Sequence, residues 1–318
     1  MRAAIRERYG DPLDVVRVVD RPEPQLEPDR VLVEVAAGGL NSLDWRLTRA
    51  TPRLVRASEG LRAPRDPRLG EDVSGTVVAV GSAVTRFAPG DRVFGQGRGA
   101  FAERVAPREK FLAPAPSAIT LADAASLAVA GTTALQAIQF ASGTGPGLGP
   151  GSRVLVIGAA GGVGTFAVQL AASTGAEVTG VCSGAKADFV RSQGAAHVID
   201  YTTQDIAGEY DLIVELAVAA PLRRTASLLR PGGTLVLSSG DGGALLGPLP
   251  RIAAAAFDRR IRMLAAQTTT DSLLEVARLV DAGALRPVIT DRYPLERAAD
   301  AIAHLERGHT LGKVLLEP

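Results

Sequence analysis

Val154-Leu-Val-Ile-Gly-Ala-Ala-Gly-Gly-Val-Gly-Thr-Phe-Ala-Val-Gln-Leu170 is the stretch that decides the fold of this chain. Its first four residues are apolar and three of them are β-branched, which predicts a buried parallel strand. Gly161, Gly162 and Gly164 then indicate a sharp turn, and apolar residues at helical spacing follow the turn. A strand, a glycine turn and a helix in succession direct free backbone N–H groups and the positive end of a helix at one point. That point suits a pyrophosphate group.

The residues after this turn indicate which dinucleotide would bind. The glycines alone are a weak signal, because a turn without a ligand could look the same, and Ala159 replaces the first glycine of the usual fingerprint. A second strand is expected over 177–182, and an NAD-preferring site carries Asp or Glu near its end, about 20 residues past the glycines. The chain has Cys182-Ser-Gly-Ala-Lys186 there instead. Because a hydroxyl and a cation suit a 2′-phosphate, Ser183 and Lys186 predict that the cofactor is NADPH.

The composition is that of an ordinary globular protein. The 318 residues exceed one typical domain and suggest two, and a 46% share of hydrophobic residues is enough to bury a substantial core. A net charge of +1 gives no general reason to expect binding to nucleic acid or to an anionic membrane. One cysteine excludes an intramolecular disulfide framework. Because no long apolar stretch and no signal peptide are evident, we expect a cytoplasmic protein.

The order of segments along the chain predicts two kinds of domain. Short apolar segments alternate with turn residues over residues 1 to about 115, which predicts a small β-barrel. A proline-rich passage then leads into an alanine-rich helical segment, 121–140. Beyond it, strands and helices alternate as in a doubly wound parallel sheet, before a helix over 271–282 leads back to a last strand at 313–316. Strands of the parallel sheet are expected near 153–158, 177–182, 197–199, 211–215, 233–238 and 260–265.

Several phrases along the chain are specific: Gly70-Glu-Asp-Val-Ser-Gly-Thr-Val-Val-Ala-Val-Gly81, Phe87-Ala-Pro-Gly-Asp-Arg-Val93, Ala130-Gly-Thr-Thr-Ala-Leu-Gln136, Gly158 to Gly164, Val198-Ile-Asp-Tyr201 and Gly308-His-Thr-Leu-Gly-Lys-Val314. Together they resemble the medium-chain dehydrogenase/reductase superfamily, in its zinc-independent quinone oxidoreductase-like branch. The resemblance covers essentially the whole chain. It implies a GroES-like β-barrel catalytic domain at 1–118 and 286–318, an inserted Rossmann NADP-binding domain at 119–285, and a homodimer.

The chain departs from the zinc alcohol dehydrogenases of that superfamily at the metal positions. Asn41 stands where those enzymes carry a Cys ligand, and Glu71 stands where they carry a His ligand. The cysteine-rich lobe that binds structural zinc is absent. A catalytic zinc needs three protein ligands, and three scattered histidines with one cysteine do not supply them. We therefore expect no metal site.

Two residues are candidates for the catalytic site by this resemblance. Asn41 is expected to face the nicotinamide and the substrate, although its amide could equally satisfy backbone groups of its own loop. Asp44 could orient Asn41 or hold the loop, and it could equally cap a helix before Trp45. At the matched positions of the sequence, no His or Tyr is an obvious general acid, so water could supply the proton.

The predicted cofactor contacts come from several parts of the chain. Thr132 or Thr133 is expected near the nicotinamide, unless one of them is only the N-cap of a helix that follows Gly131. Tyr201 is expected beside the 2′-phosphate, the alternative being a packed tyrosine and a solvated lysine. Lys313 matches a family tail lysine, which could instead close a domain interface. The loops after the fifth and sixth parallel strands should also reach the cofactor. The full predicted set is Thr132, Thr133, Gly161, Gly162, Val163, Gly164, Ser183, Lys186, Tyr201, Ser238, Ser239, Gln267 and Lys313.

Seven arginines lie between Arg46 and Arg68. The first four are spaced 3, 4 and 3 residues apart, which places them on one face of an expected helix. Such a cluster usually forms a solvated surface, and it could instead attract anionic substrates to the mouth of the site. The near-neutral net charge and the lack of interleaved aromatic residues argue against nucleic acid.

These patterns predict a zinc-independent, NADPH-dependent oxidoreductase that reduces quinones or activated enones and carbonyls. Direct hydride transfer in the cleft between the domains is the expected chemistry, because conjugated acceptors delocalise the developing negative charge. The alternative is an NADPH-binding sensor or scaffold with little turnover. A small molecule is the expected partner, with no nucleic acid and no membrane.

Overall fold

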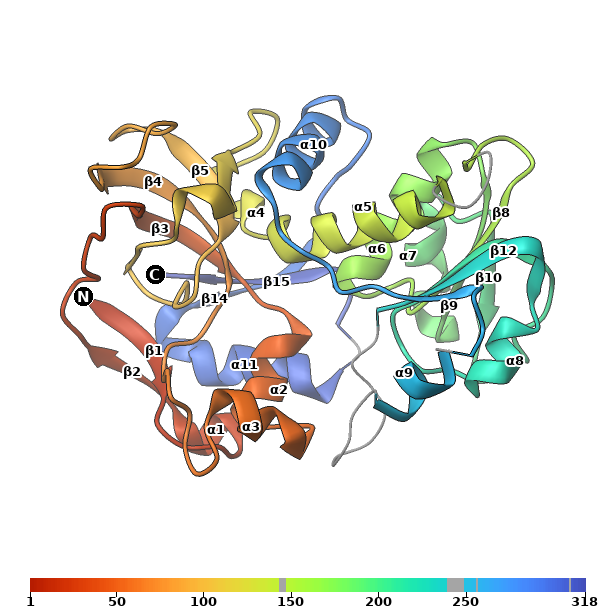
Figure 1. The fold of residues 1–318 in the computed structure, drawn as a ribbon, viewed down its shortest axis with the longest axis horizontal. Helices are drawn as coiled ribbons and strands as arrows, with labels where there is room; N and C mark the ends of the chain where they lie inside the picture. Colours follow the sequence, from red (N-terminus) through yellow and green to blue (C-terminus); the bar gives the residue numbers. More distant parts are fainter. Residues whose placement is uncertain (143–146, 239–248, 256, 309) are drawn as a thin grey trace. The chain divides into compact units, whose positions relative to one another are not determined.

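The computed structural model describes residues 1–142, 147–238, 249–255, 257–308 and 310–318 (Figure 1). The described chain forms two compact units, Met1–Thr132 with Gln267–Pro318, and Thr133–Ala266. Each unit has its own sheet and its own buried core. Within the residues that the structure describes, no helix is long and apolar enough to cross a membrane.

The second unit is built on a six-stranded parallel sheet, which confirms the doubly wound pattern. The strand order is β10-β9-β8-β11-β12-β13, so the chain starts in the middle of the sheet and winds outward in both directions. Leu155, Ile213 and Leu235 of the central strands are fully buried in the core. The strands are β8 (Arg153–Ile157), β9 (Glu177–Cys182), β10 (His197–Asp200), β11 (Tyr210–Glu215), β12 (Leu229–Leu237) and β13 (Ile261–Met263).

Helices pack on the strands of this parallel sheet. α6 (Gly162–Ser173) contacts β8 and β9, and α7 (Ala187–Ser192) contacts β9 and β10. α8 (Leu222–Ala226) contacts β12, and α9 (Leu249–Ala255) contacts β13. α5 (Ala128–Ser142) begins in the first unit and continues in the second.

The first unit contains a mixed sheet of seven strands and a separate antiparallel pair, β1–β2. The path β14-β15-β3-β4-β5-β7 is antiparallel except between β14 and β15, and β6 pairs with β3. Val33, Val73 and Val77 lie in its buried core. The strands are β1 (Arg2–Arg6), β2 (Val16–Asp20), β3 (Val31–Gly39), β4 (Asp72–Val80), β5 (Arg92–Gln96), β6 (Arg104–Val105), β7 (Leu112–Pro114), β14 (Ile289–Pro294) and β15 (Lys313–Glu317).

The pairing of β3 with β4 decides which side chains meet at one end of this sheet. The antiparallel register pairs Gly39, the last residue of β3, with Asp72, the first residue of β4. Glu71 directly precedes β4, and Asn41 follows β3 by two residues. Gly39 and Asp72, which are far apart in the sequence, therefore lie side by side at the end of the sheet.

Helices α1, α2 and α11 pack together beside the strands of the first unit (Figure 1). Ala298, Ala301 and Ile302 form the buried face of α11. The expected helix at 271–282 is confirmed as α10, whereas α11 was not expected. The helices are α1 (Pro12–Val15), α2 (Ser42–Arg49), α3 (Arg56–Glu59), α4 (Leu121–Ala124), α10 (Thr270–Asp281) and α11 (Ala298–Arg307), with 3-10 turns at Arg53–Val55, Glu109–Phe111 and Leu295–Arg297.

The stretches 119–132 and 267–285 fold with the first unit, although the predicted domain bounds place them in the cofactor domain. α10 packs against β7 of the first unit. Asp281 at the end of α10 accepts backbone hydrogen bonds from Ser117 and Ala118, at 2.8 and 2.9 Å. The helical pattern of these stretches resembles an α/β layer, but their partners are strands and loops of the β-rich unit.

The arginine-rich segment 46–56 is not a single helix, so the prediction of one arginine face is wrong. α2 ends at Arg49, and Ala50 adopts a left-handed conformation with φ 53°. Pro52 explains the break, because a proline disfavours helical geometry at the residue before it, here Thr51. The arginines make separate contacts instead, namely Arg49 with Asp11 and Glu306, Arg46 over the Trp45 ring, and Arg56 over the Tyr9 ring.

Candidate functional site

Asn41 lies at the N-cap of α2, directly after β3. Its backbone is extended, with φ −132° and ψ 157°. Asp44, one turn into the helix, accepts a hydrogen bond from the Asn41 backbone N–H at 2.7 Å, and the two residues form a capping box. Asp44 is 4% exposed. The structure therefore places Asp44 where one contact both caps the helix and holds the Asn41 loop.

A buried lysine fixes the side chain of Asn41. Lys313, the first residue of β15, is 3% exposed and donates to Asn41 Oδ1 and to the Leu40 carbonyl oxygen, each at 2.7 Å. Its ammonium group lies 3.6 Å from Oδ2 of Asp72, which is fully buried. Lys313, expected as a cofactor residue, thus lies in the interior of the first unit against Asn41. Its contact with a cofactor stays a prediction.

Asp72 also receives the first turn of α5. The Val129 N–H donates to Asp72 Oδ1 at 3.1 Å. Burial raises the pKa of Asp72, while the Lys313 ammonium, the Asn41 amide and the Val129 N–H oppose the shift. Burial lowers the pKa of Lys313, and the charges of Asp72 and Asp44 oppose that shift. Each charge of the buried pair therefore compensates part of the desolvation cost of the other.

Thr132 and Thr133 lie one turn inside α5, so the alternative that one of them is an N-cap is wrong. The helix begins at Ala128, and the Thr132 hydroxyl donates to the Ala128 carbonyl oxygen at 2.5 Å. This bond to the preceding turn is how a helix accommodates a threonine in its interior. Both threonines are buried. They follow, by one turn, the end of α5 that contacts Asp72.

Two carboxyl groups near Asn41 titrate close to neutrality. Burial raises the pKa of Asp44 to about 7, opposed by the Asn41 N–H and reinforced by the charges of Glu71 and Asp72. Burial also raises the pKa of Glu71 to about 7, opposed by Arg98 and reinforced by neighbouring carboxylates. The charge of Glu71 therefore contributes to the raised pKa of Asp44.

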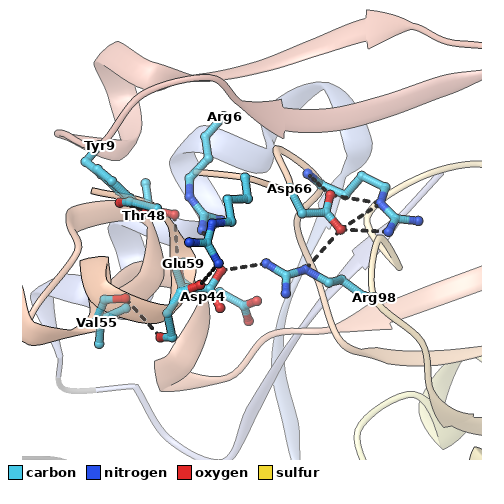
Figure 2. A network of polar contacts seen from close by, with 12 residues as sticks. Arg6, Tyr9, Asp44, Thr48, Val55, Glu59, Asp66 and Arg98 are labelled. Carbon is cyan, nitrogen blue, oxygen red and sulfur yellow. Dashed lines mark hydrogen bonds and ion pairs between the residues drawn. The ribbon is translucent and has the colours of Figure 1, made fainter. Parts of the chain in front are cut away.

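A network of arginines and carboxylates surrounds the second of these acids, Glu71. Figure 2 shows Arg98 between two carboxylates of this network. Its Nη2 donates to Glu59 Oε2 at 2.6 Å, and its Nε lies 3.3 Å from Asp66 Oδ2. Arg6, which is 1% exposed, lies 3.9 Å from the same Glu59 oxygen. The guanidinium of Arg98 therefore pairs with the carboxylates of Glu59 and Asp66.

The glycine turn of the second unit has the form that a pyrophosphate needs. α6 begins at Gly162 with Gly161 as its N-cap, and no side chain caps the helix. A Cβ at Gly161 would approach only the Gly158 carbonyl oxygen, at 3.5 Å, so this side of the turn is open. A Cβ at Gly164 would lie 2.2 Å from that oxygen, so glycine is required for α6 to pack on the turn. The N–H groups of the first turn, which includes Val163, fit an anion.

The loop after β9 carries the residues predicted for a 2′-phosphate. Ser183 is half-buried and precedes a 3-10 turn, Gly184–Lys186, without capping it through its side chain. Burial lowers the pKa of Lys186. Asp200, the last residue of β10, lies against the loop, since a Cβ at Gly184 would be 2.5 Å from its Oδ2. Cofactor contacts by these residues stay predictions.

The carboxylate of Asp200 accepts hydrogen bonds from the two loops beside it. The Thr202 hydroxyl and N–H donate to its Oδ1 at 2.7 and 3.0 Å, and these bonds, with the Gly184 N–H, lower the pKa of Asp200. The carboxylate therefore ties the loop after β9 to the loop after β10. Tyr201, the next residue, is 50% exposed and lines a surface pocket with Asp205.

The remaining predicted residues are placed in different parts of the chain. Ser238 follows β12, and its N–H donates to the Glu215 carbonyl oxygen at 3.0 Å. Gln267 is exposed and belongs to the first unit. Ser239 lies outside the described residues. Contacts of these residues with a cofactor stay predictions.

Within the described ranges, no group of three or more His, Cys, Asp or Glu side chains is arranged to hold a metal ion. Cys182 is a buried free thiol. His197 is exposed, and His304 contacts the Tyr293 hydroxyl at 2.9 Å. His309 lies outside the described residues.

Comparison with known proteins identifies the family. Residues 27–117 match the alcohol dehydrogenase GroES-like domain, and residues 193–316 match the zinc-binding dehydrogenase domain. The chloroplast envelope quinone oxidoreductase homolog of Arabidopsis thaliana is 32% identical over 331 residues, which cover 100% of this chain and 98% of that protein. The chain belongs to the medium-chain dehydrogenase/reductase superfamily. Within it, the chain falls in the quinone oxidoreductase-like branch.

Two further proteins that are similar to this chain bear on its chemistry. The NADPH-dependent alkenal/one oxidoreductase of Arabidopsis thaliana is 29% identical over 339 residues, covering 100% of this chain and 80% of that protein. A solved mycobacterial protein, complexed with NADPH, is 26% identical with a TM-score of 0.81 and covers 100% of both chains. The protein is therefore an oxidoreductase of this superfamily with a nicotinamide cofactor.

Sequence reasoning does not reveal several buried charged residues of the two units. Glu71 stands out in the sequence only as a position where a zinc ligand is missing, and Asp72, the first residue of the buried strand β4, is not singled out there. Arg6 ends an otherwise apolar strand segment. Glu215 ends the apolar strand β11, is fully buried and pairs with Arg251 of α9. For Arg6 and Glu215, the signal is a charged residue at the end of a strand with buried apolar residues.

Proposed function

We propose that this chain is a zinc-independent, NADPH-dependent reductase of quinones or of activated enones and carbonyls. The observation that carries the proposal is the set of contacts around Asn41, where a buried Lys313–Asp72 pair and the Asp44 cap hold an amide at a position that carries a zinc ligand in the alcohol dehydrogenases. Relatives named for quinone and for alkenal/one reduction support these two classes of acceptor.

Residues of the second unit fit the cofactor. NADPH, when bound, supplies the hydride that the acceptor takes up. The open first turn of α6 at Gly161 and Gly162 provides N–H groups for the pyrophosphate. Ser183 and Lys186 provide a hydroxyl and a cation for the 2′-phosphate. Asp200 carries the same sign of charge as a phosphate, but it accepts hydrogen bonds from its own loops and orders them.

On the acceptor side, the first unit supplies oriented polar groups. An acceptor that gains a hydride develops negative charge, and hydrogen-bond donors fixed in advance stabilise this charge without reorganising. Lys313 holds Asn41 Oδ1 and so fixes the direction of the Asn41 amide. A neutral amide at this position offers no thiolate to a zinc ion. We infer that Asn41 faces the reacting groups and that Lys313 and Asp72 position it.

We also propose that the protein is a cytoplasmic homodimer that acts on a small molecule, with no nucleic-acid or membrane partner. The near-neutral net charge of +1 supports the absence of a nucleic-acid partner. Sedimentation velocity checks the dimer, which a single species with the mass of one chain would contradict.

Loss of NADPH absorbance with a panel of small quinones and enones tests the proposed activity. We expect turnover with at least one acceptor, faster with NADPH than with NADH, and unchanged after dialysis against a zinc chelator with the metal content measured in parallel. Tight NADPH binding without oxidation across the panel would contradict the proposal and favour a sensor or scaffold. Activity that is lost on chelation and restored by zinc would contradict its zinc-independent part.

A further inference from the structure

Glu71 is the acid of this site that the structure leaves without a partner. Four other carboxyl groups nearby are engaged: Asp44 by the Asn41 N–H, Glu59 by Arg98, Asp66 by Arg68 and Arg98, and Asp72 by Lys313. Within the part of the chain that the structure describes, the Glu71 carboxyl group makes neither a hydrogen bond nor an ion pair. It also lies half-buried, so it remains reachable.

The surroundings of Glu71 favour its protonated form. Asp72, Glu59 and Asp66 act on it as like charges, which disfavour ionisation. Lys313 acts on Asp72 and Asp44, and its ammonium donates to Leu40 and Asn41. Burial is the largest cause, and it raises the pKa of Glu71 to about 7. Arg98 opposes this shift, although its guanidinium binds Glu59 and Asp66. Arg68 binds Asp66, and Arg6 lies against Glu59.

Glu71 lies close to the residues that hold the amide that we expect at the reacting groups. It directly precedes Asp72, which faces Lys313 and the Asn41 amide. Its charge also acts on Asp44, which accepts the Asn41 N–H. Asp44 is the other acid with a raised pKa, but it is 4% exposed, accepts the Asn41 N–H and lies at the positive end of α2. Its carboxylate is therefore enclosed and engaged, whereas that of Glu71 is neither.

We propose that Glu71 holds a proton in the resting protein and donates it to the substrate after hydride transfer, a role that rests on the proposed function. A substrate that has accepted a hydride carries an additional electron pair, as an enolate or a hydroquinone anion, and needs one proton. The O–H bond of Glu71 breaks, a C–H or O–H bond forms on the substrate, and the electron pair of the broken bond stays on the carboxylate. Water then returns a proton to Glu71.

Glu71→Gln tests this proposal because it keeps the shape of the side chain and removes the acidic proton. With an enone acceptor, we expect turnover below neutral pH to fall by about 10²-fold or more, the lower end of what a positioned acid supplies. We also expect the wild-type fall in turnover above about pH 7 to disappear in the variant, and Glu71→Asp to restore part of both. Glu34→Gln, on the exposed side of β3, is the matched control and leaves the rate unchanged.

Two measurements on the free protein complete the test. NADPH affinity, measured by fluorescence titration, should be the same in wild type and Glu71→Gln, which shows that the variant folds and binds. The infrared band of a protonated carboxyl group that titrates near neutrality should lose intensity in Glu71→Gln. A variant with wild-type turnover and pH profile, or an unchanged infrared band, overturns the proposal while the reductase function stands. A wild type that reduces no acceptor overturns the reductase function and with it the donor role, whereas the infrared band still decides whether Glu71 holds a proton.

Discussion

At the scale of single residues, the position of Asn41 depends on charges that come from three separate strands and helices. Asp44 holds its backbone, and Lys313 holds its side chain. Lys313 in turn faces Asp72, which also receives the first turn of α5. A buried ion pair contributes little net stability, but removal of one partner leaves the other charge unpaired in the interior. Stability and site geometry are therefore linked at Lys313.

Replacement of Lys313 by Met should destabilise the first unit by about 3–5 kcal/mol, because the Asp72 charge is left without its cation. Lys313→Met combined with Asp72→Asn should recover part of this loss, since the amide still accepts the Val129 N–H. Urea unfolding followed by the fluorescence of Trp45, the single tryptophan, reports on this unit. Equal loss in the single and double variants would contradict the coupling, and Lys110→Met serves as a surface control.

The raised pKa of Glu71 predicts a pH dependence of stability. Its pKa is about 7 in the folded protein against 4.5 for an ordinary glutamate, so the folded state binds this proton more tightly. The resulting stabilisation is fully present below about pH 4.5 and is lost as the pH rises toward 7. We expect the unfolding free energy of wild type relative to Glu71→Gln to fall by on the order of 2–3 kcal/mol over this window. A difference that stays constant from acid to neutral pH would contradict this.

Much of the residue-scale site could not be predicted from the sequence. Asn41 and Glu71 stand out only by resemblance, as positions where zinc ligands are missing. The contact of Lys313 with Asn41 joins residues 272 positions apart, and no local pattern encodes such a contact. Asp44 could be predicted as a capping residue because capping is local, with Asp44 three residues after Asn41.

At the scale of elements, the β8–α6 turn has two glycines with different tasks. Gly164 allows close packing of α6, whereas Gly161 leaves space on the side where an anion would approach. The sequence predicts this unit well, because strand, glycine turn and helix follow each other without interruption. The sequence also contains a signal for α11 of the first unit, since Ala298, Ala301 and Ile302 recur at helical spacing. The arginine spacing predicted one helical face wrongly, because Pro52 prevents a continuous helix over this segment.

Alanine substitutions at these two glycines should have different effects. Gly164→Ala places a Cβ 2.2 Å from the Gly158 carbonyl oxygen and should lower the melting temperature. Gly161→Ala fits its φ of −80° and meets that oxygen at 3.5 Å, so the fold should persist while NADPH affinity falls. Thermal melts and fluorescence titration with NADPH separate the two effects. A Gly161→Ala protein with wild-type affinity would contradict pyrophosphate binding at this turn.

The loop after β9 should discriminate between the two dinucleotides. Lys186→Ala should weaken NADPH binding by about 1.5–3 kcal/mol, the scale for hydrogen bonds to charged groups, and should barely change NADH binding. Isothermal titration with both cofactors measures the difference. Similar losses for NADPH and NADH would remove Lys186 from the 2′-phosphate site.

At the scale of the whole molecule, the chain returns from its second unit to complete the first. β15 pairs with β3, and this pairing brings Lys313 to the end of β3, close to Asn41 at the N-cap of α2. The order of a β-rich part, a parallel sheet and a return could be predicted from the alternation of segments. The exact places where the units divide could not, because α10 looks like a helix of the parallel sheet yet packs on β7.

The proposed function is hydride transfer from NADPH to a conjugated acceptor without a metal. Mass spectrometry of the product formed by chelator-treated protein, from an enone and NADPH deuterated at nicotinamide C4, tests it most directly. We predict one deuterium on the β-carbon of the reduced enone, from one face of the nicotinamide, in protein whose metal content is negligible. Product without deuterium, or deuterium transfer that requires added zinc, would contradict the account.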